Sequence, residues 1–119
     1  MNSEFRFDIR GYLQPAERIL TTVDELKGSF VDAFEESETR EQIFEQYLIF
    51  NEAFGREITP NFTQWLDGSF VSNKNNPNDL DILILLNATD FIPNKILIDQ
   101  KFRLHEAKKL FPLLEIFIQ

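Results

Sequence analysis

One run of seven residues, Leu80 to Leu86, constrains the fold of this chain more than any other feature. It reads Leu-Asp-Ile-Leu-Ile-Leu-Leu, so Asp81 is the one residue in it that is not aliphatic. A short continuous apolar run is typical of a strand that is buried on both faces. A charge within such a strand is costly unless it has a partner. We therefore predict a buried strand over residues 80–86 and interpret Asp81 as a functional residue.

The amount of apolar sequence predicts one folded domain. The chain has 119 residues, of which 43% are hydrophobic and 13 are phenylalanine. That length suits a single domain, and so many aromatic residues argue against disorder. We predict one domain over residues 1–119, in which residues 1–21 form an irregular lead-in because Gly11 and Pro15 interrupt regular structure.

Charge and cysteine content exclude several classes of function. The chain carries 12 Lys and Arg against 20 Asp and Glu, a formal net charge of −8, and it has no cysteine. Binding to extended nucleic acid needs a basic surface, and disulfides, thiolate catalysis and Cys-ligated metal sites need cysteine. The longest uninterrupted aliphatic run, Ile82 to Leu86, is too short to cross a membrane, and residues 1–10 lack the apolar core of a signal peptide. We therefore expect a cytoplasmic protein that binds neither a membrane nor a long stretch of nucleic acid.

Two helices are predicted in the first half of the chain. Thr22 and Glu25 stand at capping-box spacing, which predicts a helix that begins near Thr22. Its apolar positions recur at helical intervals: Val23, Leu26, Phe30 and Phe34. Thr39 and Gln42 form a second candidate capping box, and Gly55 is placed to end that helix. The apolar stripe of the second helix comprises Ile43, Phe44, Tyr47, Leu48 and Phe54.

The second half of the chain predicts three strands and one further helix. Residues 62–66 and 113–118 are rich in apolar residues and, with residues 80–86, form the predicted strands. A turn at Asp67-Gly68-Ser69 and a polar loop over 72–79 join the first two strands, and a helix over 94–110 precedes the last. Helices packed against one mixed sheet define an α/β or α+β domain.

Two acidic residues, Asp79 and Asp81, are spaced so that their side chains meet. In a strand, residues i and i+2 project from the same face, so these carboxylates converge on one spot. Like charges so close repel one another, and each raises the pKa of the other unless a cation lies between them. A divalent cation that prefers oxygen ligands, such as Mg²⁺, removes that repulsion. The pair therefore predicts a magnesium site.

Gly68 and Ser69 offer a different kind of contact, and Ser69 stands ten positions before Asp79. A glycine after a strand lets the backbone approach a ligand closely, and successive N–H groups in such a turn can surround a phosphate. The serine hydroxyl adds a further donor. Each signal is weak alone, because Gly-Ser is common and Asp79 also suits a turn in an ordinary hairpin.

Together these residues resemble the signature of the nucleotidyltransferase superfamily related to DNA polymerase beta: a strand, Gly-Ser, a spacer, and Asp-x-Asp at the start of an apolar strand. The sequence Asp-Gly-Ser-Phe-Val, followed by Lys, Pro and Asp-x-Asp, resembles the corresponding sequence in a family of small bacterial nucleotidyltransferase-like proteins. The resemblance covers most of the chain. It implies that Asp79 and Asp81 bind two Mg²⁺ ions that hold a nucleoside triphosphate, with ATP as the expected donor. It further implies that Gly68 and Ser69 hold the phosphates, and that a third carboxylate helps to activate the attacking group.

We assign the third carboxylate to Glu115, which lies alone within the apolar residues 113–118. An outward-facing glutamate on an edge strand is the structural alternative, and Asp90 and Asp99 are the other candidate acids. Lys74, in the loop after the Gly-Ser turn, is either a phosphate contact or a solvated lysine. His105 is the one histidine, and we expect it on the surface.

The sequence also departs from the superfamily pattern. Residues 72–74 contain no second glycine, and the third acid is a glutamate where aspartate is usual. Larger members add a helical domain for the base and the acceptor, whereas this sequence ends at Gln119, directly after the last predicted strand. We therefore expect that the isolated chain needs a protein partner or a second copy for full activity. The one basic cluster comprises Lys101, Arg103, Lys108 and Lys109. It either forms a charged helix face or contacts an acidic partner.

Two functions are consistent with these residues. The first is an enzyme that transfers a nucleoside monophosphate from a triphosphate to a hydroxyl on a protein, an RNA end or a small molecule. Similar domains occur as antitoxins that modify a partner toxin, so the resemblance includes a protein acceptor. The second is a catalytically degenerate module that binds a nucleotide weakly, or binds a partner through an apolar surface.

Overall fold

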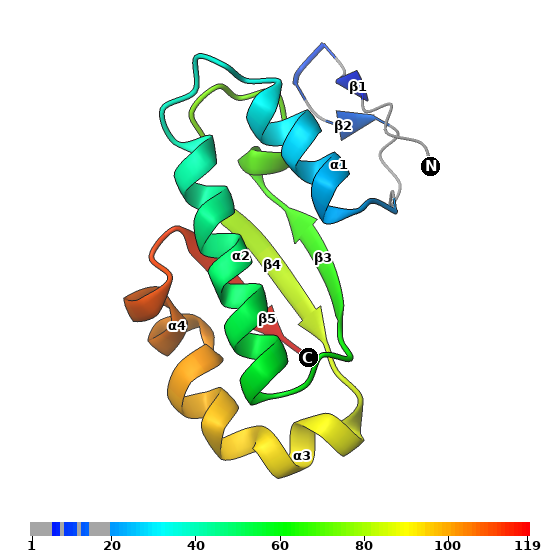
Figure 1. Cartoon of the computed structure of the whole chain (residues 1–119), viewed down its shortest axis with the longest axis vertical. Helices are drawn as coiled ribbons and strands as arrows, with labels where there is room; N and C mark the ends of the chain where they lie inside the picture. Colours follow the sequence, from blue (N-terminus) through cyan, green and yellow to red (C-terminus); the bar gives the residue numbers. More distant parts are fainter. Residues whose placement is uncertain (1–5, 8, 12, 15–19) are drawn as a thin grey trace.

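A three-stranded mixed sheet forms the centre of the structure (Figure 1), a computed structural model that describes residues 6–7, 9–11, 13–14 and 20–119. Strand β3 (Thr63–Asp67) pairs antiparallel with β4 (Leu80–Leu85), and β4 pairs parallel with β5 (Leu114–Ile118). The strand order β3-β4-β5 places the aliphatic strand β4 in the middle. Because helices from both halves of the chain pack on this sheet, the predicted α+β class is confirmed.

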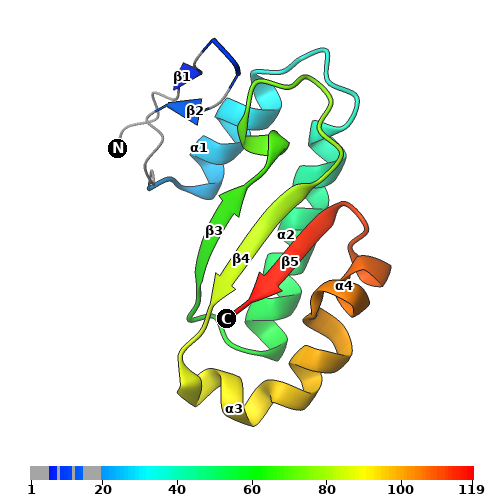
Figure 2. The same ribbon diagram turned by 180° about the vertical axis from the view of Figure 1, so that it is seen from behind.

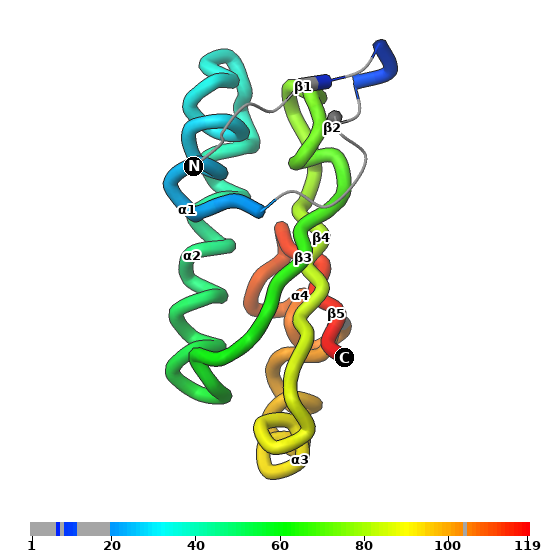
Figure 3. The backbone as a smooth tube through the Cα atoms, turned by 90° about the vertical axis from the view of Figure 1, so that its right-hand side faces the viewer, coloured from blue at the N-terminus to red at the C-terminus, as the bar shows by residue number. Residues whose placement is uncertain are grey.

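Helices cover one face of the sheet. Leu80, Ile82 and Ile84 of β4 are fully buried, whereas the alternate residues Asp81, Leu83 and Leu85 are half-buried. Figure 3 shows α2 on one side of the strands, and Figure 2 shows the opposite face with no described helix across it. The prediction that β4 is buried on both faces is therefore wrong. The strand has aliphatic residues on both faces, but the described helices cover only one of them.

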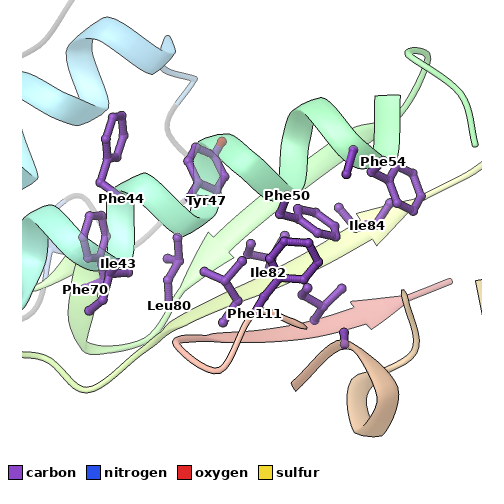
Figure 4. Packing of buried hydrophobic residues seen from close by; sticks show 14 of the residues in the cluster. Ile43, Phe44, Tyr47, Phe50, Phe54, Phe70, Leu80, Ile82, Ile84 and Phe111 are labelled. Atoms are coloured by element: carbon purple, nitrogen blue, oxygen red, sulfur yellow. The ribbon is translucent and has the colours of Figure 1, made fainter. Parts of the chain in front are cut away.

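Helix α2 (Arg40–Glu57) supplies six core residues, more than any other element that the structure describes (Figure 4). Its buried apolar residues are Ile43, Phe44, Tyr47, Phe50, Ala53 and Phe54. They belong to the same core cluster as Leu80, Ile82 and Ile84 of β4. Two details of the sequence prediction are wrong here. Leu48 is 42% exposed, and Phe50, at 0%, lies in the core. The helix also continues through Gly55 to Glu57, because Gly55 does not adopt the left-handed conformation that ends helices.

The start of α2 differs from the predicted capping box. The side chain of Thr39 makes no capping hydrogen bond. Instead Ser37 Oγ accepts from the backbone N–H of Arg40 at 3.1 Å. A serine two positions earlier thus satisfies a free donor of the first turn.

The capping box at the first helix is confirmed. Thr22 Oγ1 accepts from the N–H of Glu25 at 3.1 Å, and Glu25 Oε1 accepts from the N–H of Thr22 at 3.2 Å. Helix α1 (Val23–Lys27) continues into a π-helical segment, η1 (Gly28–Asp32). Its core residues are Leu26, Phe30 and Val31, whereas Val23 is 44% exposed.

The helix predicted over 94–110 is longer and interrupted. Helix α3 (Ala88–Leu97) runs into a π-helical segment, η3 (Ile98–Phe102), and α4 (Leu104–Leu110) follows. Arg103 has φ −71° and ψ 151°, which is extended backbone, so the two helices are separate. Among the described residues, no helix is both long enough and apolar enough to span a membrane.

The predicted lead-in contains a small hairpin. Strands β1 (Arg6–Phe7) and β2 (Leu13–Gln14) pair antiparallel, so the lead-in is not irregular throughout. Gly11 has φ +89°, and its carbonyl accepts from the N–H of Asn73 at 3.1 Å. The hairpin therefore contacts the loop that follows the Gly-Ser turn. The rest of the predicted lead-in, 1–5, 8, 12 and 15–19, lies outside the described residues, Pro15 included.

Candidate functional site

Three acidic residues form a row across the open face of the sheet. Asp81 of β4 is the register partner of Asp67 on β3 and of Glu115 on β5. Directly opposed residues on neighbouring strands project from the same face, with Cβ atoms about 4.5–5.5 Å apart. The strand register therefore brings together carboxylates that lie far apart along the chain.

Asp79 joins this row from the loop that leads into β4. One carboxylate oxygen from each of Asp79, Asp81 and Glu115 lies within 4.8 Å of the others. All three residues are half-buried, so solvent and ligands reach them. Converging carboxylates are the oxygen ligands that Mg²⁺ prefers in proteins. The residues present fit a magnesium ion in donor type, and their carboxylate oxygens converge on one place.

The electrostatics of Asp81 reflect this crowding. Burial, together with the negative charges of Glu115 and Asp79, raises the pKa of the Asp81 carboxyl from its ordinary 3.8 to about 6. A carboxylate with a raised pKa is destabilised in its charged form. A bound cation would relieve that destabilisation, because it replaces repulsion with attraction.

Asp67 is an acidic residue of the site that sequence reasoning missed. We interpreted it only as part of the turn, yet its negative charge also contributes to the raised pKa of Asp81. Its own Oδ1 accepts from the N–H of Gly68 at 2.8 Å. The only sequence signal was an acid at the end of a predicted strand, and that signal becomes informative once the register of β3 on β4 is known.

Gly68 and Ser69 lie directly beside the row. Gly68 has φ +91°, a conformation that favours glycine, and a Cβ atom built on it would lie 3.0 Å from Asp81 Oδ2. The backbone of the turn therefore packs against the central carboxylate. Ser69 is half-buried and begins a short 3₁₀ helix, η2 (Ser69–Val71). The structure thus brings the Gly-Ser turn and the acidic residues together.

Lys74 is exposed in the loop after η2. Within the described residues, its ammonium group makes no hydrogen bond or ion pair; the backbone of the residue does make contacts. Its carbonyl accepts from Arg40 at 2.6 Å and its N–H donates to Ser72 Oγ at 3.2 Å. The structure therefore fixes the main chain of Lys74 and leaves its side chain in solvent.

The remaining candidate acids lie away from the row. Asp90 is in α3, which follows the end of β4, whereas Asp81 is near its beginning. Asp99 is paired with Lys95 at 2.7 Å and with Arg103 at 2.9 Å. Glu115 is the acid that reaches Asp81, because its strand lies beside β4. His105 is exposed on α4, as expected.

The basic cluster divides into two kinds of residue. Three of its members pair with acids outside the row: Lys101 with Glu57, Arg103 with Asp99, and Lys109 with Glu106. Lys108 differs, because its Nζ lies 3.9 Å from Asp79 Oδ2 while it donates to the carbonyl of Pro112 at 3.1 Å. Lys108 therefore places a positive charge at the edge of the acidic site.

An apolar row lies next to the acidic row on the same face. Leu83 is the register partner of Trp65 on β3 and of Phe117 on β5. Trp65 is 41% exposed and Phe117 is 45% exposed. Since residues i and i+2 of a strand are about 6.6 Å apart along it, this row is one step from the carboxylates. The open face therefore combines an acidic and an apolar surface.

The fold is α+β, and the site is a cluster of carboxylates beside a glycine turn. Residues 5–117 match the family described as "Family of unknown function (DUF6932)", and the chain belongs to that family. No curated protein and no solved structure matches the chain.

Proposed function

We propose that this protein is a Mg²⁺-dependent nucleotidyltransferase. It would transfer a nucleoside monophosphate from a nucleoside triphosphate, with ATP as the expected donor, to a hydroxyl group of an acceptor. Asp79, Asp81 and Glu115 would hold the metal, two ions being expected. Bound Mg²⁺ would neutralise the charge of the triphosphate and of the pyrophosphate that leaves.

One observation carries the proposal. The carboxylates of Asp79, Asp81 and Glu115 converge within 4.8 Å, and the Gly68 turn packs against the central one of them. A structural role accounts poorly for this arrangement, because clustered negative charges destabilise a fold unless a cation offsets them. A site that binds a metal ion and a phosphate attached to it accounts for both the converging carboxylates and the glycine turn beside them.

The reaction assigns a role to each group. The acceptor oxygen forms a bond to the α-phosphorus, while the bond from that phosphorus to the bridging oxygen of pyrophosphate breaks. The acceptor hydroxyl loses its proton, and Glu115 is the proposed base because the resemblance gives that role to a third carboxylate beside the Asp79 and Asp81 pair. Gly68 and Ser69 would hold the phosphates of the leaving pyrophosphate. The exposed side chain of Lys74 would make a further contact with them.

The acceptor is a hydroxyl on a protein, an RNA end or a small molecule. An antitoxin-like role, in which the acceptor belongs to a partner protein, agrees with the apolar row beside the carboxylates. Such a partner, or a second copy of the chain, would cover Leu83 and Phe117. The cytoplasm is the proposed compartment, because it contains both Mg²⁺ and nucleoside triphosphates.

A transfer assay tests the proposal. The chain is incubated with Mg²⁺ and each of the four NTPs, labelled at the α-phosphate, alone and with proteins and RNA that co-purify with it. We expect label on one acceptor class in a Mg²⁺-dependent manner. Asp81→Asn should abolish the transfer, and Asp90→Asn, the same change in charge on α3, should leave it intact.

A second candidate is a module that binds a nucleotide or a partner without turnover. The observation that favours it is the exposed apolar row, which suits a docking surface. Thermal melting separates the two candidates, because a ligand that binds the folded state raises its apparent stability. A melting temperature raised by Mg²⁺ and ATP, with no transfer to any acceptor, would favour the second candidate.

A further inference from the structure

Arg40 is a fully buried arginine at the start of α2, with 1% of its surface exposed. Its guanidinium donates four hydrogen bonds, all to backbone carbonyls. Nη1 donates to the carbonyl of Phe30 at 2.9 Å and to that of Phe70 at 2.6 Å. Nη2 donates to the carbonyl of Ser72 at 2.8 Å and to that of Lys74 at 2.6 Å.

Aromatic rings enclose the same guanidinium. Its central carbon lies 3.8 Å from the centroid of Phe34 and 5.2 Å from that of Phe70. Within the described residues, Arg40 makes no salt bridge, and its Nε has no hydrogen-bond partner. Burying a charge is expensive, and main-chain carbonyls and rings offset that expense here in place of a carboxylate. So costly an arrangement calls for a role beyond filling the core.

Most of the carbonyls that Arg40 holds belong to one short segment, residues 70–74. Three of the four, at Phe70, Ser72 and Lys74, follow the Gly-Ser turn at intervals of two residues. Gly68, two residues before that segment, lies against Asp81. Arg40 thereby connects the buried end of α2 to the turn that faces the carboxylates.

Other contacts of this loop use neutral groups near the surface. The N–H of Asn73 donates to the carbonyl of Gly11 at 3.1 Å, and Asn76 Oδ1 accepts from the N–H of Glu38 at 2.7 Å. Hydrogen bonds to a charged donor are stronger than these neutral ones, and burial protects them from competition by water. Among the described residues, Arg40 is therefore the strongest anchor of the segment.

We propose that Arg40 is a positioning residue, which holds residues 70–74 so that the Gly68-Ser69 turn stays in place to receive the phosphates of the substrate. The inference rests on the proposed function, because it assumes that the turn contacts phosphate. It also predicts a separation of two affinities. Asp81 and Glu115 are fixed by the β4–β5 ladder, and Asp79 directly precedes β4, so metal binding should not depend on Arg40.

Calorimetry on the full chain tests this separation with Arg40→Lys. Lysine keeps the charge but has three donors on one nitrogen and cannot span four carbonyls. We expect an unchanged affinity for Mg²⁺ alone and an affinity for ATP, measured with saturating Mg²⁺, that is lower by about tenfold or more. Arg56→Lys is the control, because Arg56 is exposed on the same helix and should change neither affinity.

A second variant keeps the test decisive if Arg40→Lys does not fold. Phe34→Leu removes the ring that lies over the guanidinium and retains Arg40. It should weaken ATP binding in the same direction and by less. Hydrogen exchange supplies an independent readout, since amides of residues 70–74 should exchange faster in either variant while those of β5 do not.

The outcomes separate the two proposals. If the folded variants bind ATP as tightly as the original chain and exchange no faster over 70–74, Arg40 only stabilises the core and the inference is overturned. If the original chain binds Mg²⁺ but no nucleotide at all, the proposed function fails and the inference fails with it. A loss of ATP affinity with retained Mg²⁺ affinity supports both.

Discussion

Asp81 and Glu115 are register partners in the parallel ladder of β4 and β5, and their carboxylates lie on the face of the sheet away from α2. Each therefore has a negative neighbour at cross-strand distance. Asp79 and Asp67 add further negative charge around Asp81. The sheet therefore carries a local electrostatic cost that a divalent cation would offset.

Asp81→Asn should stabilise the metal-free protein. The substitution keeps the shape of the side chain and removes the central charge of the row, so repulsion from Glu115 and Asp79 disappears. After allowance for solvent screening we expect a gain of about 1 kcal/mol, which corresponds to a melting temperature about 4 °C higher at pH 7.5. Differential scanning calorimetry in EDTA measures it. Asp90→Asn is the matched control and should give no comparable gain; an unfolded Asp81→Asn protein would identify Asp81 as a structural hydrogen-bond partner instead.

The same gain should depend on pH in a defined direction. The folded-state pKa of Asp81, about 6, is above its ordinary 3.8, so the folded protein binds this proton more tightly than the unfolded chain does. The stability cost of the charge is absent below pH 3.8, grows as the pH rises, and is fully developed above pH 6. The difference in melting temperature between Asp81→Asn and the original chain should therefore shrink as the pH falls and vanish below pH 3.8. A difference that stays constant from pH 4 to pH 7.5 would show that the charge of Asp81 is not its cause.

Binding of Mg²⁺ should weaken as the pH falls through 6. The metal needs the ionised carboxylate, and protons compete for it below the pKa of Asp81, which is about 6. Well below that value the apparent affinity should fall by about tenfold for each pH unit. Titration calorimetry between pH 5 and pH 8 follows the change. An affinity independent of pH over this range would place the metal elsewhere.

Gly68→Ala should destabilise the protein and disturb the site. A Cβ atom there would lie 3.0 Å from Asp81 Oδ2, and the backbone φ of +91° is unfavourable for alanine. We expect a loss of about 1–3 kcal/mol in the free energy of unfolding, measured by urea titration, together with weaker ATP binding. Gly28→Ala provides the contrast, because Gly28 is helical with open space around it and should gain up to about 1 kcal/mol. Equal effects at the two glycines would contradict the close approach of the turn to Asp81.

Lys108→Gln should strengthen Mg²⁺ binding. Lys108 Nζ lies 3.9 Å from Asp79 Oδ2, so its charge opposes an incoming cation. Because the pair is partly exposed, the effect should be modest, about two- to fivefold at low ionic strength, and should disappear in high salt. Lys109→Gln removes the same charge from a lysine paired with Glu106 and should have little effect. A loss of Mg²⁺ affinity in Lys108→Gln would mean that Lys108 orients Asp79 for the metal.

Local signals in the sequence predicted much of this structure. The capping box at Thr22 and Glu25 depends only on residues within one helical turn, and it forms as expected. The three strands of the sheet and the position of the Gly-Ser turn were also predictable, because each is marked by composition over a few residues. The lone acid in each of two apolar strands, Asp81 and Glu115, identified two members of the acidic row.

Features that depend on distant parts of the chain were not predictable in the same way. Asp67 joins the row through the register of β3 on β4, which no local pattern specifies. Phe50 is buried and Leu48 exposed because of the rotation of α2 about its axis, which packing against the sheet decides. Arg40 carried no signal at all, since its partners are carbonyl oxygens and every residue has one. The break at Arg103 depends on the backbone path between α3 and α4.

The alternation of faces along β4 separates what maintains the fold from what would perform chemistry. Leu80, Ile82 and Ile84 are committed to the core, whereas Asp81 lies among residues that the core does not need. A descendant of this chain that lost these acidic residues would therefore keep its fold. The fold would also be more stable, because the repulsion between the carboxylates would be gone. Without selection for the site, mutation would gradually remove such residues. Among relatives of this protein, lineages that retain both Asp81 and Glu115 should therefore be those under selection for the site. Lineages that have lost both should have kept only the fold.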